Sequence, residues 1–302
     1  MKKISLDKSV FLVNPISGKL SLNKKVNIIK KIIKGTKAEI IISNSIDNAL
    51  EIASNSMKGK KIVVACGGDG LVNIVAHQAI LNDGIIAILP FGRGNDFAKS
   101  LSIFSENDLI NSFKFPNIIN ARYIQVNFKD NYRISLTCAG VGLLSEAAYR
   151  ASRIPILKGV LLYAFATIFS FINLKNHKYK LIFDDQKLNE ELLIVAAAAS
   201  QYTGGGMYIA PEAFKIQKKV NVLYSTKVNH MNAIKLLLSV FNGNHLKHFA
   251  VKNLHTKNLS ISSHSNNFWA NLVYGDGEYL GNLPVRIQLG KKKLRVLVPK
   301  IR

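Results

Sequence analysis

The chain has 302 residues, of which 48% are hydrophobic and 20% charged, as in a soluble globular protein long enough for one large domain or two. Its 41 Lys and Arg residues against 18 Asp and Glu give a formal net charge of +23. Such an excess attracts polyanions, namely nucleotides, nucleic acid or anionic lipid surfaces, although a lysine-rich composition that serves only solubility explains most of it equally well.

The cysteines and the hydrophobic stretches argue against a secreted or membrane-spanning protein. Cys66 and Cys138 lie in apolar contexts without metal-type spacing, which indicates a reduced compartment. No apolar core of signal-peptide length follows Met1, and the most hydrophobic stretch, Gly159–Leu174, is too short and too interrupted to span a membrane. We therefore expect a cytoplasmic protein with at most a peripheral membrane contact.

The first hundred residues alternate short apolar runs with segments of helical spacing. We expect strands at Ser9–Val13, Glu39–Ser43, Ile62–Ala65 and Ile85–Leu89, and helices at 21–34, Ile46–Met57, 71–81 and from Asn95 or Asp96 onward. This alternation predicts a parallel, doubly wound sheet. Three of its strands end in Gly-rich turns, at 14–19, 66–70 and 90–96. Because ligands bind at the carboxyl ends of such strands, the three turns are expected to form one site.

After about residue 122 strand-like segments dominate. They are Tyr123–Asn127, Tyr132–Ala139, Tyr179–Phe183, Glu191–Ala199, Val220–Tyr224, Leu259–Ser262, Phe268–Val273, Val285–Leu289 and Leu294–Val298, with helical interruptions at about 145–173 and 231–241. We therefore expect an α/β nucleotide-binding domain at 1–122 and a β-rich domain at 123–286, with residues 287–302 returning to the first domain.

The turn Cys66-Gly67-Gly68-Asp69-Gly70 is the most informative of the three. Its glycines let the backbone approach a ligand closely, and the helix that follows directs unpaired N–H groups and its dipole toward an anion. A carboxylate at Asp69 is repelled by polyphosphate unless it holds Mg²⁺ or orients neighbouring donors. Taken alone, the stretch is equally compatible with a tight turn that carries a solvated Asp. No P-loop or complete dinucleotide fingerprint occurs elsewhere in the chain.

Five motifs follow one another along the chain. They are Asn14-Pro15-x-Ser17-Gly18-Lys19, Gly67-Gly68-Asp69-Gly70, Pro90-x-Gly92-x-Gly94-Asn95-Asp96-Phe97-Ala98, Gly204-Gly205-Gly206 with Ala210-Pro211, and Gly275-Asp276-Gly277-Glu278. Their order and spacing resemble the diacylglycerol kinase catalytic-domain family, which comprises bacterial diacylglycerol kinase-like lipid kinases and is related to the sphingosine and ceramide kinases. The resemblance covers nearly the whole chain.

This resemblance implies a doubly wound N-terminal domain like that of NAD kinases and diacylglycerol kinases, a C-terminal β-sandwich domain, and an active cleft between them. It implies transfer of the γ-phosphate of ATP to a lipid hydroxyl, diacylglycerol being the first expectation. The resemblance gives Asp276 the role of the general base and Glu278 a supporting role. Without the other motifs, Gly275-Asp276-Gly277 would indicate only a hairpin turn with an exposed Asp. The residues that the resemblance places around ATP are Asn14, Ser17, Gly18, Lys19, Ser43, Gly67, Gly68, Asp69, Gly70, Leu71, Asn73, Gly92, Arg93, Asn95 and Asp96. Asp69 and Asp96 are candidates to lie near the Mg²⁺ that accompanies ATP.

Some positions depart from the family pattern. Leu71 and Arg93 stand where Thr is common, and Ile74 stands where Glu is expected. The segment 214–221, acidic in many bacterial members that hold a structural Mg²⁺ there, reads Phe-Lys-Ile-Gln-Lys-Lys-Val-Asn, and Asn120 stands where Asp is common. Neutral or basic residues cannot replace carboxylates around a hard cation. The structural metal site is therefore expected to be lost or remodelled.

Membrane contact and rival functions complete the expectations. Residues 153–175 suit an interfacial helix, the wall of a lipid cleft or a buried helix equally well. Lys291–Lys293, with Arg295, Lys300 and Arg302, is a candidate surface for an anionic membrane, or a solvated tail. The alternatives are a small-molecule kinase of the NAD kinase group and a non-catalytic nucleotide- or lipid-binding regulator. Nucleic acid is not an expected partner, and a homodimer stays open.

Overall fold

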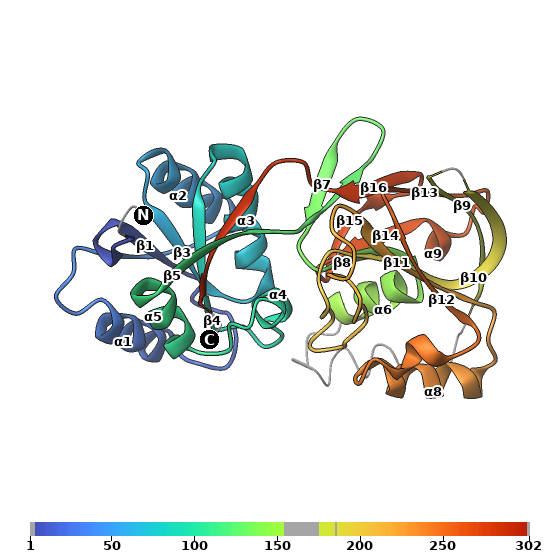
Figure 1. Cartoon of the computed structure of the whole chain (residues 1–302), viewed down its shortest axis with the longest axis horizontal. Helices are drawn as coiled ribbons and strands as arrows, with labels where there is room; N and C mark the ends of the chain where they lie inside the picture. The colour runs from blue at the N-terminus through green and yellow to red at the C-terminus, as the bar shows by residue number, and fades with distance from the viewer. Residues whose placement is uncertain (1–3, 154–174, 185, 301–302) are drawn as a thin grey trace. The chain divides into compact units, whose positions relative to one another are not determined.

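The computed structural model describes residues 4–153, 175–184 and 186–300. Contacts divide the chain into two compact units (Figure 1). The first comprises Met1–Ala121 with Lys291–Arg302, and the second comprises Arg122–Gly290. Among the described residues no helix is long and apolar enough to cross a membrane. The hydrophobic stretch at 159–174 lies outside the described residues.

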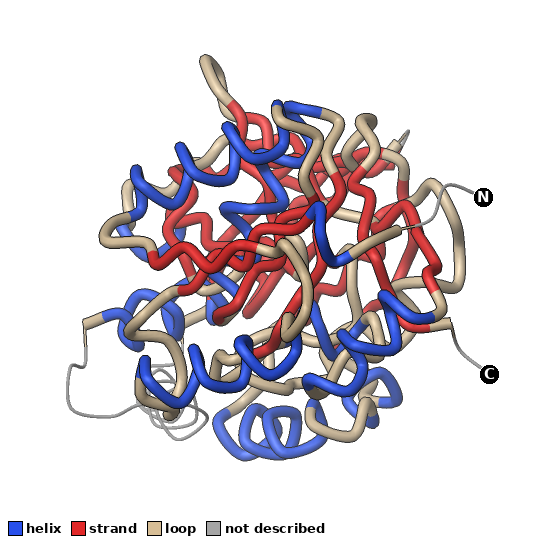
Figure 2. Tube along the Cα trace, turned by 90° about the vertical axis from the view of Figure 1, so that its left-hand side faces the viewer, coloured by secondary structure: helices blue, strands red, loops and turns tan. Residues whose placement is uncertain are grey.

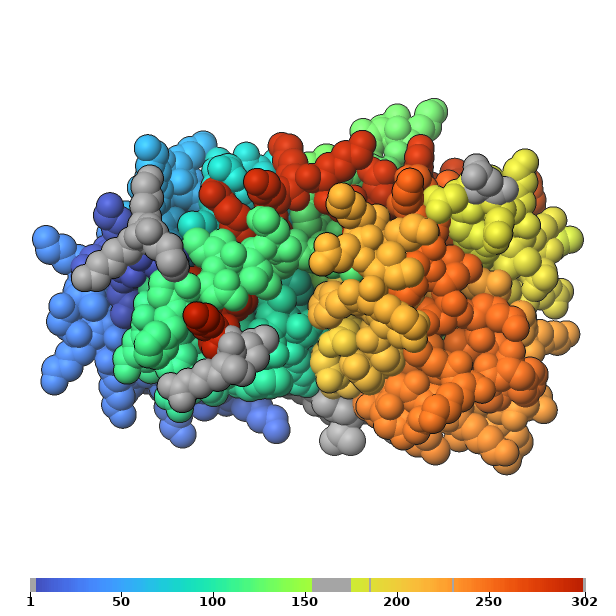
Figure 3. Space-filling model, in the orientation of Figure 1, coloured from blue at the N-terminus to red at the C-terminus, as the bar shows by residue number. Residues whose placement is uncertain are grey.

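The first unit is built on a six-stranded sheet in the order β2-β1-β3-β4-β17-β5. The bounds are β1 (Ser9–Val13), β2 (Glu39–Ile42), β3 (Ile62–Gly67), β4 (Ile85–Pro90), β5 (Pro116–Ala121) and β17 (Leu294–Pro299). All neighbouring pairs are parallel except β17 and β5. Strand β17, at the red end of the colour scale, lies among the blue and cyan elements of this unit (Figures 1 and 3). The chain thus returns to its first sheet after building the second unit.

Helices cover both faces of this sheet (Figure 2). They are α1 (Leu22–Ile32), α2 (Ile46–Lys58), α3 (Asp69–Asn82), α4 (Asp96–Ser100) and α5 (Glu106–Lys114). Ile29 of α1 and Leu109 of α5 pack with Phe11 and Val64 on one face, whereas α2 and α3 pack together on the other. The side chains of Ser21 and Ser45 each accept a hydrogen bond from the backbone N–H of the residue three positions later. These caps fix where α1 and α2 begin.

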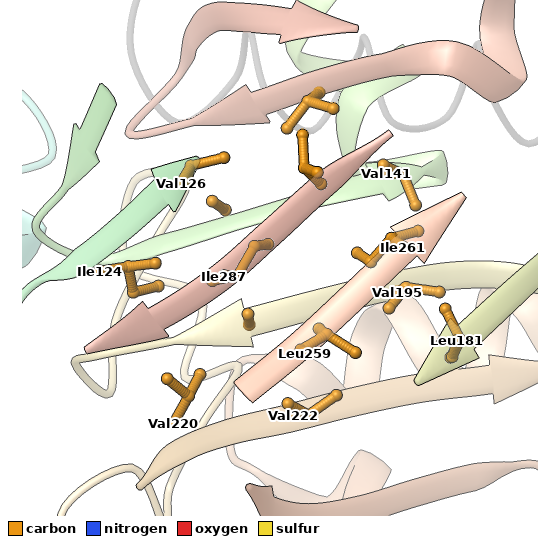
Figure 4. Packing of buried hydrophobic residues seen from close by; sticks show 14 of the residues in the cluster. Ile124, Val126, Val141, Leu181, Val195, Val220, Val222, Leu259, Ile261 and Ile287 are labelled. Atoms are coloured by element: carbon orange, nitrogen blue, oxygen red, sulfur yellow. The ribbon is translucent and has the colours of Figure 1, made fainter. Parts of the chain in front are cut away.

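The second unit is an eleven-stranded antiparallel sheet that folds over its own core as a sandwich-like domain. Its strands are β6 (Ile124–Asn127), β7 (Tyr132–Ser135), β8 (Cys138–Gly142), β9 (His177–Phe183), β10 (Gln186–Ala198), β11 (Val220–Thr226), β12 (Val251–Thr256), β13 (Asn258–Ser263), β14 (Leu272–Gly275), β15 (Glu278–Asn282) and β16 (Val285–Leu289). Alternate residues such as Ile124, Val126, Leu259, Ile261 and Ile287 point into this core (Figure 4). In the described part of this unit the α-helices are α6 (Leu143–Ser152), α8 (His230–Val240) and α9 (Phe268–Asn271).

The fold class is confirmed, with local corrections to the predicted elements. The expected strand Tyr132–Ala139 is wrong as one element, because it breaks at Leu136 and Thr137 into β7 and β8. Residues 268–271 form the short helix α9 and not the start of a strand, because Asn267 caps the backbone N–H of Trp269. Helix α5 and strands β5, β12 and β15 were not anticipated. The helix expected at about 145–173 begins at Leu143, and its part beyond residue 153 lies outside the described residues.

Candidate functional site

The three Gly-rich turns of the first unit lie against one another. A Cβ atom added to Gly92 would lie 2.4 Å from Cα of Gly68, and one added to Gly18 would lie 1.8 Å from the carbonyl oxygen of Phe91. Only glycine permits such approaches, and Gly18 also has a φ of +67°. The turns that follow β1, β3 and β4 therefore form one surface at the carboxyl ends of these strands.

The turn between β3 and α3 has the geometry of an anion cradle. Gly68 is the N-cap of α3, which begins at Asp69, and as a glycine it offers no side chain to cap the first N–H groups, which point out of the start of the helix. Oδ1 of Asp69 accepts a hydrogen bond of 3.3 Å from the backbone N–H of Phe97, which links this turn to α4. The side chain of Leu71 is buried, so Leu71 can offer a ligand only its backbone. Asn73, further along α3, is half-buried.

A buried lysine holds the turn after β1. The ammonium of Lys25 donates to the carbonyl oxygens of Asn14 (2.9 Å) and Pro15 (3.0 Å) and to Oγ of Ser17 (3.1 Å). Burial lowers the pKa of Lys25, and the nearby thiol of Cys66 opposes this effect. Sequence reasoning missed Lys25, because it is one of several lysines in the same helix and nothing local distinguishes it from the others. Lys19, in contrast, is exposed.

The turn after β4 is held by its own asparagine. Asn95, with a φ of 53°, accepts from the N–H of Gly92 (2.9 Å) and donates to the carbonyl of Gly92 (3.1 Å). Arg93 donates to the carbonyl of Gly18 (3.4 Å), and Asp96 is buried. Ser43 follows β2, which lies on the far side of β1 from β3, and donates to the carbonyl of Val13. It is the candidate farthest along the sheet from the glycine turn at 67–70.

In the second unit, Asp276 lies in the two-residue turn that joins β14 to β15. Asp276 and Gly277 have φ values of 53° and 81°, as both central residues of a type I′ hairpin turn require. The Asp276 carboxylate accepts four hydrogen bonds. The donors are Oγ of Ser135 (2.9 Å), Oγ1 of Thr137 (2.6 Å), N–H of Thr137 (2.9 Å) and N–H of Leu136 (2.6 Å). The last residue of β7 and the break at Leu136 and Thr137 supply these donors, so this segment fixes the orientation of the carboxylate.

Thr203 and Glu278 lie close to the Asp276 turn. The hydroxyls of Thr137 and Thr203 lie 3.1 Å apart, which ties the turn to the segment before Gly204. Although the side chain of Glu278 is exposed, protein atoms around it displace water from its carboxyl group and thereby raise its pKa. The negative charge of Asp276 raises this pKa further, whereas the positive charge of Arg133 lowers it. Sequence reasoning missed Ser135 and Thr137, because a hydroxyl within a predicted strand carries no local signal. It also missed Thr203, although Thr203 directly precedes the Gly204-Gly205-Gly206 motif.

An apolar cavity of about 140 Å³ adjoins Asp276 and Gly277 within the second unit. Side chains from α6, β10, β11 and α8 line it, among them Leu143, Ala147, Leu193, Leu223 and Leu236. Cys138 also borders the cavity; its burial raises the pKa of its thiol and keeps it neutral. Thr203, Gly204 and Tyr274 also line the cavity. A carboxylate thus stands at the border of an otherwise apolar cavity.

Residues 8–125 match the model of the diacylglycerol kinase catalytic domain, and residues 137–298 match that of the YegS C-terminal NAD kinase beta sandwich-like domain. Among curated proteins the chain is 23% identical to a diacylglycerol kinase of Mycobacterium tuberculosis, over 99% of this chain and 98% of the relative. It is 24% identical to a diacylglycerol kinase of Bacillus subtilis, over 79% and 78%. A solved structure of a putative diacylglycerol kinase from Bacillus anthracis has the same fold, with a TM-score of 0.74, 16% identity and 97% of each chain covered.

The first unit thus carries three glycine turns on a parallel sheet, and the second is a sandwich-like domain of the kind that the NAD kinase beta sandwich-like model describes. With family models matching both units, the chain belongs to the diacylglycerol kinase-like family.

Proposed function

We propose that this protein transfers the γ-phosphate of ATP to a hydroxyl group of a lipid, with diacylglycerol as the first candidate acceptor. The observation that carries the proposal is the apolar cavity of the second unit, which borders the Asp276 turn. An acyl chain fits such a lining, and its hydroxyl-bearing end would then lie beside a carboxylate. The names of the relatives support the same acceptor class.

Asp276 is proposed to act as the general base. Its carboxylate would take the hydroxyl proton while the hydroxyl oxygen attacks the γ-phosphorus and the bond to the ADP oxygen breaks. Ser135, Leu136 and Thr137 hold the carboxylate in one orientation for this transfer. Glu278, whose pKa is raised first by the surrounding protein atoms and then by the charge of Asp276, is proposed to support the base from the next strand.

The glycine turns of the first unit are proposed to bind the ATP phosphates. The N–H groups at the start of α3 and the close approach of Gly68 and Gly92 suit a polyphosphate. Among the described residues no three His, Cys, Asp or Glu side chains cluster as a metal site. A Mg²⁺ that arrives with the nucleotide needs only one or two carboxylates, and Asp69 fits this role better than the buried Asp96. The ion would supply charge neutralisation on the phosphates.

A small polar acceptor, as in the NAD kinase group, is less well supported. The cavity beside Asp276 offers such a molecule few polar partners, because most of its lining side chains are apolar. The remaining expectations are part of this proposal: a peripheral position on the cytoplasmic side of an anionic membrane, and a role in phospholipid metabolism.

The test is transfer of labelled γ-phosphate from ATP to a panel of lipids in mixed micelles. The variant is Asp276→Asn, and the matched control is Asp184→Asn. Asp184 also has a left-handed backbone (φ 48°) and accepts two backbone N–H bonds, from Lys257 and Asn258, but lies away from the cavity lining. We expect Asp276→Asn to lose about 10²–10⁴-fold in kcat and Asp184→Asn to keep its activity. Equal activity in both variants would remove Asp276 as the base. No labelled lipid with any acceptor, while ATP still binds, would favour the non-catalytic regulator.

A further inference from the structure

Helix α8 presents apolar side chains on two opposite sides. Ala233, Leu236, Leu237 and Val240 line the cavity that borders Asp276. On the other side, Met231, Ile234, Leu238 and Phe241 follow one another at helical spacing and are 66%, 47%, 69% and 45% exposed. A helix that only covered the cavity would carry polar residues on its outer side.

The exposed apolar surface continues beyond the helix. Phe249, which follows the short helical turn Asn244–Lys247 packed on α8, is 74% exposed. In the space-filling view, residues 230–250 form an orange surface at the outside of the second unit (Figure 3). We call Met231, Ile234, Leu238, Phe241 and Phe249 the α8 patch. Gathered exposed side chains of this size mark an interaction surface.

The charge around the α8 patch points to one kind of partner. Residues 213–275 contain eight lysines and no Asp or Glu. Of these lysines, Lys227, Lys235, Lys247 and Lys252 are exposed in or near α8 and the strands beside it, and Lys227 lies 3.8 Å from Glu191 of β10. An apolar patch bordered by lysines suits the interface of an anionic bilayer, where side chains enter the acyl region and ammonium groups meet the phosphates. Nucleic acid would use the lysines but not the apolar side chains.

We propose that the α8 patch docks this protein on an anionic lipid bilayer. Docking there places the cavity one helix diameter, about 10 Å, from the leaflet. An acceptor lipid could then enter the cavity without crossing water. The α8 patch would be the membrane-facing surface of the proposed lipid kinase, so its role rests on that proposed function. Vesicle binding can nevertheless be measured without any kinase activity.

The experiment measures binding to phosphatidylglycerol vesicles by cosedimentation. The variant is Met231→Ser with Leu238→Ser, neither of which lines the cavity. The matched control is Ile46→Ser with Phe104→Ser, two residues of the first unit that are 68% and 67% exposed. We expect at least a tenfold loss of vesicle affinity in the α8 variant and none in the control. Phosphatidylcholine vesicles or 0.5 M salt should weaken wild-type binding, because the lysine contribution is then absent or screened.

The outcomes separate this inference from the proposed function. If no lipid is phosphorylated but the α8 variant loses vesicle binding, the docking surface stands and the kinase reaction does not. If the α8 variant binds vesicles as the wild type does, the inference is overturned. It is also overturned if the variant converts a dimer to a monomer without losing vesicle affinity, because the patch would then join two copies of the chain.

A second inference concerns Arg122, the first residue of the second unit. Its guanidinium donates to the carbonyl oxygens of Ala213, Ile216 and Lys219, and lies 5.9 Å from the ring centroid of Phe214. Three carbonyl oxygens of one short segment therefore converge on a single fixed cation. Strand β11, whose Leu223 lines the cavity, begins directly after this segment.

A divalent ion does not fit this segment. Residues 213–219 contain three lysines and no carboxylate, whereas Mg²⁺ and Ca²⁺ sites are built on carboxylates. The carbonyl oxygens that could serve as ligands already accept from Arg122. We infer that the guanidinium of Arg122 replaces a structural metal ion in this loop, so that the second unit folds without one.

Thermal unfolding tests this inference. The melting temperature of the wild type should be unchanged by EDTA or by millimolar Mg²⁺ or Ca²⁺. Arg122→Gly should melt several degrees lower and recover in part with methylguanidinium but not with methylammonium. Arg286→Gly, which removes an exposed guanidinium bonded to Asn258, should show no rescue. Should Arg122→Gly fail to fold, Arg122→Lys is measured in its place: it should also melt lower than the wild type, because one ammonium cannot reach all three carbonyl oxygens, and Mg²⁺ or Ca²⁺ should not restore its melting temperature. A wild-type melting temperature that falls in EDTA and returns with Mg²⁺ overturns the inference.

Discussion

The hydroxyl of Thr137 offers a direct measure of how much catalysis depends on the orientation of Asp276. Thr137 is 2% exposed and donates the 2.6 Å bond to the Asp276 carboxylate. Thr137→Val keeps the shape of the side chain and the backbone N–H bond but removes that donor. A hydrogen bond to a charged group contributes about 1.5–3 kcal/mol. If this energy serves to hold the base in place, kcat should fall by about 10–100-fold.

The control is Thr203→Val. It removes the hydroxyl that contacts Thr137 at 3.1 Å, but none of the four donors to the carboxylate described above. We expect kcat to fall less than about threefold there, because only a neutral hydrogen bond is lost. The assay is lipid phosphorylation with kcat and KM measured separately, together with the melting temperature of each variant. In Thr137→Val the KM for the acceptor should stay unchanged, since Thr137 does not line the apolar cavity. Equal kcat values for the two variants would refute the reasoning.

Three further predictions test the nucleotide turns and the carboxylates. Gly18→Ala should raise the KM for ATP at least about tenfold, because the added Cβ would overlap the backbone carbonyl of Phe91. The control is Gly35→Ala, where φ is +77° but the space around the Cβ is open. This control should leave the KM unchanged and cost only about 1 kcal/mol of stability. Lys25→Met should lower the free energy of unfolding by roughly 3 kcal/mol and weaken ATP binding, because three oxygens lose their shared donor. The exposed control Lys24→Met should change neither quantity. Urea titration measures the free energy of unfolding, and nucleotide titration measures the affinity for ATP. Glu278 binds its proton more tightly when folded than at its ordinary pKa of 4.5, so its contribution to stability falls as pH rises through the window above 4.5. Glu278→Gln should therefore be more stable than the wild type at pH 8 and no more stable at pH 4; a gain of the same size at both values would contradict the sign.

The fold was largely accessible from the sequence because its signals are local. Continuous apolar runs such as Val10–Val13 and Val63–Ala65 are typical of buried strands, and strands with helices between them indicate a parallel sheet. The same logic failed at Leu136 and Thr137. Their hydrophobic neighbours predict an unbroken strand, and only the contact with Asp276, about 140 residues later, explains why the ladder stops there.

The residues of the candidate sites were likewise only partly predictable from the sequence. Their motif residues could be named in advance because the glycine turns have a characteristic spacing, and the structure brings the turns after β1, β3 and β4 together. The residues that hold the sites in place could not be named. Lys25 resembles every other lysine of its helix, and Arg122 gives no sign that it binds three carbonyls of a segment some ninety residues away. Such roles depend on long-range packing, which a single sequence does not encode locally.

The position of β17 has a consequence for how this chain is made. The strand lies between β4 and β5 and pairs with both, yet it is synthesised after the whole second unit. Until residues 294–299 leave the ribosome, β4 presents an open edge of unpaired backbone groups, and β5 has no partner in the sheet. The second unit is continuous in sequence and can fold as soon as it emerges. The unit that begins first during translation is therefore the one that is completed last.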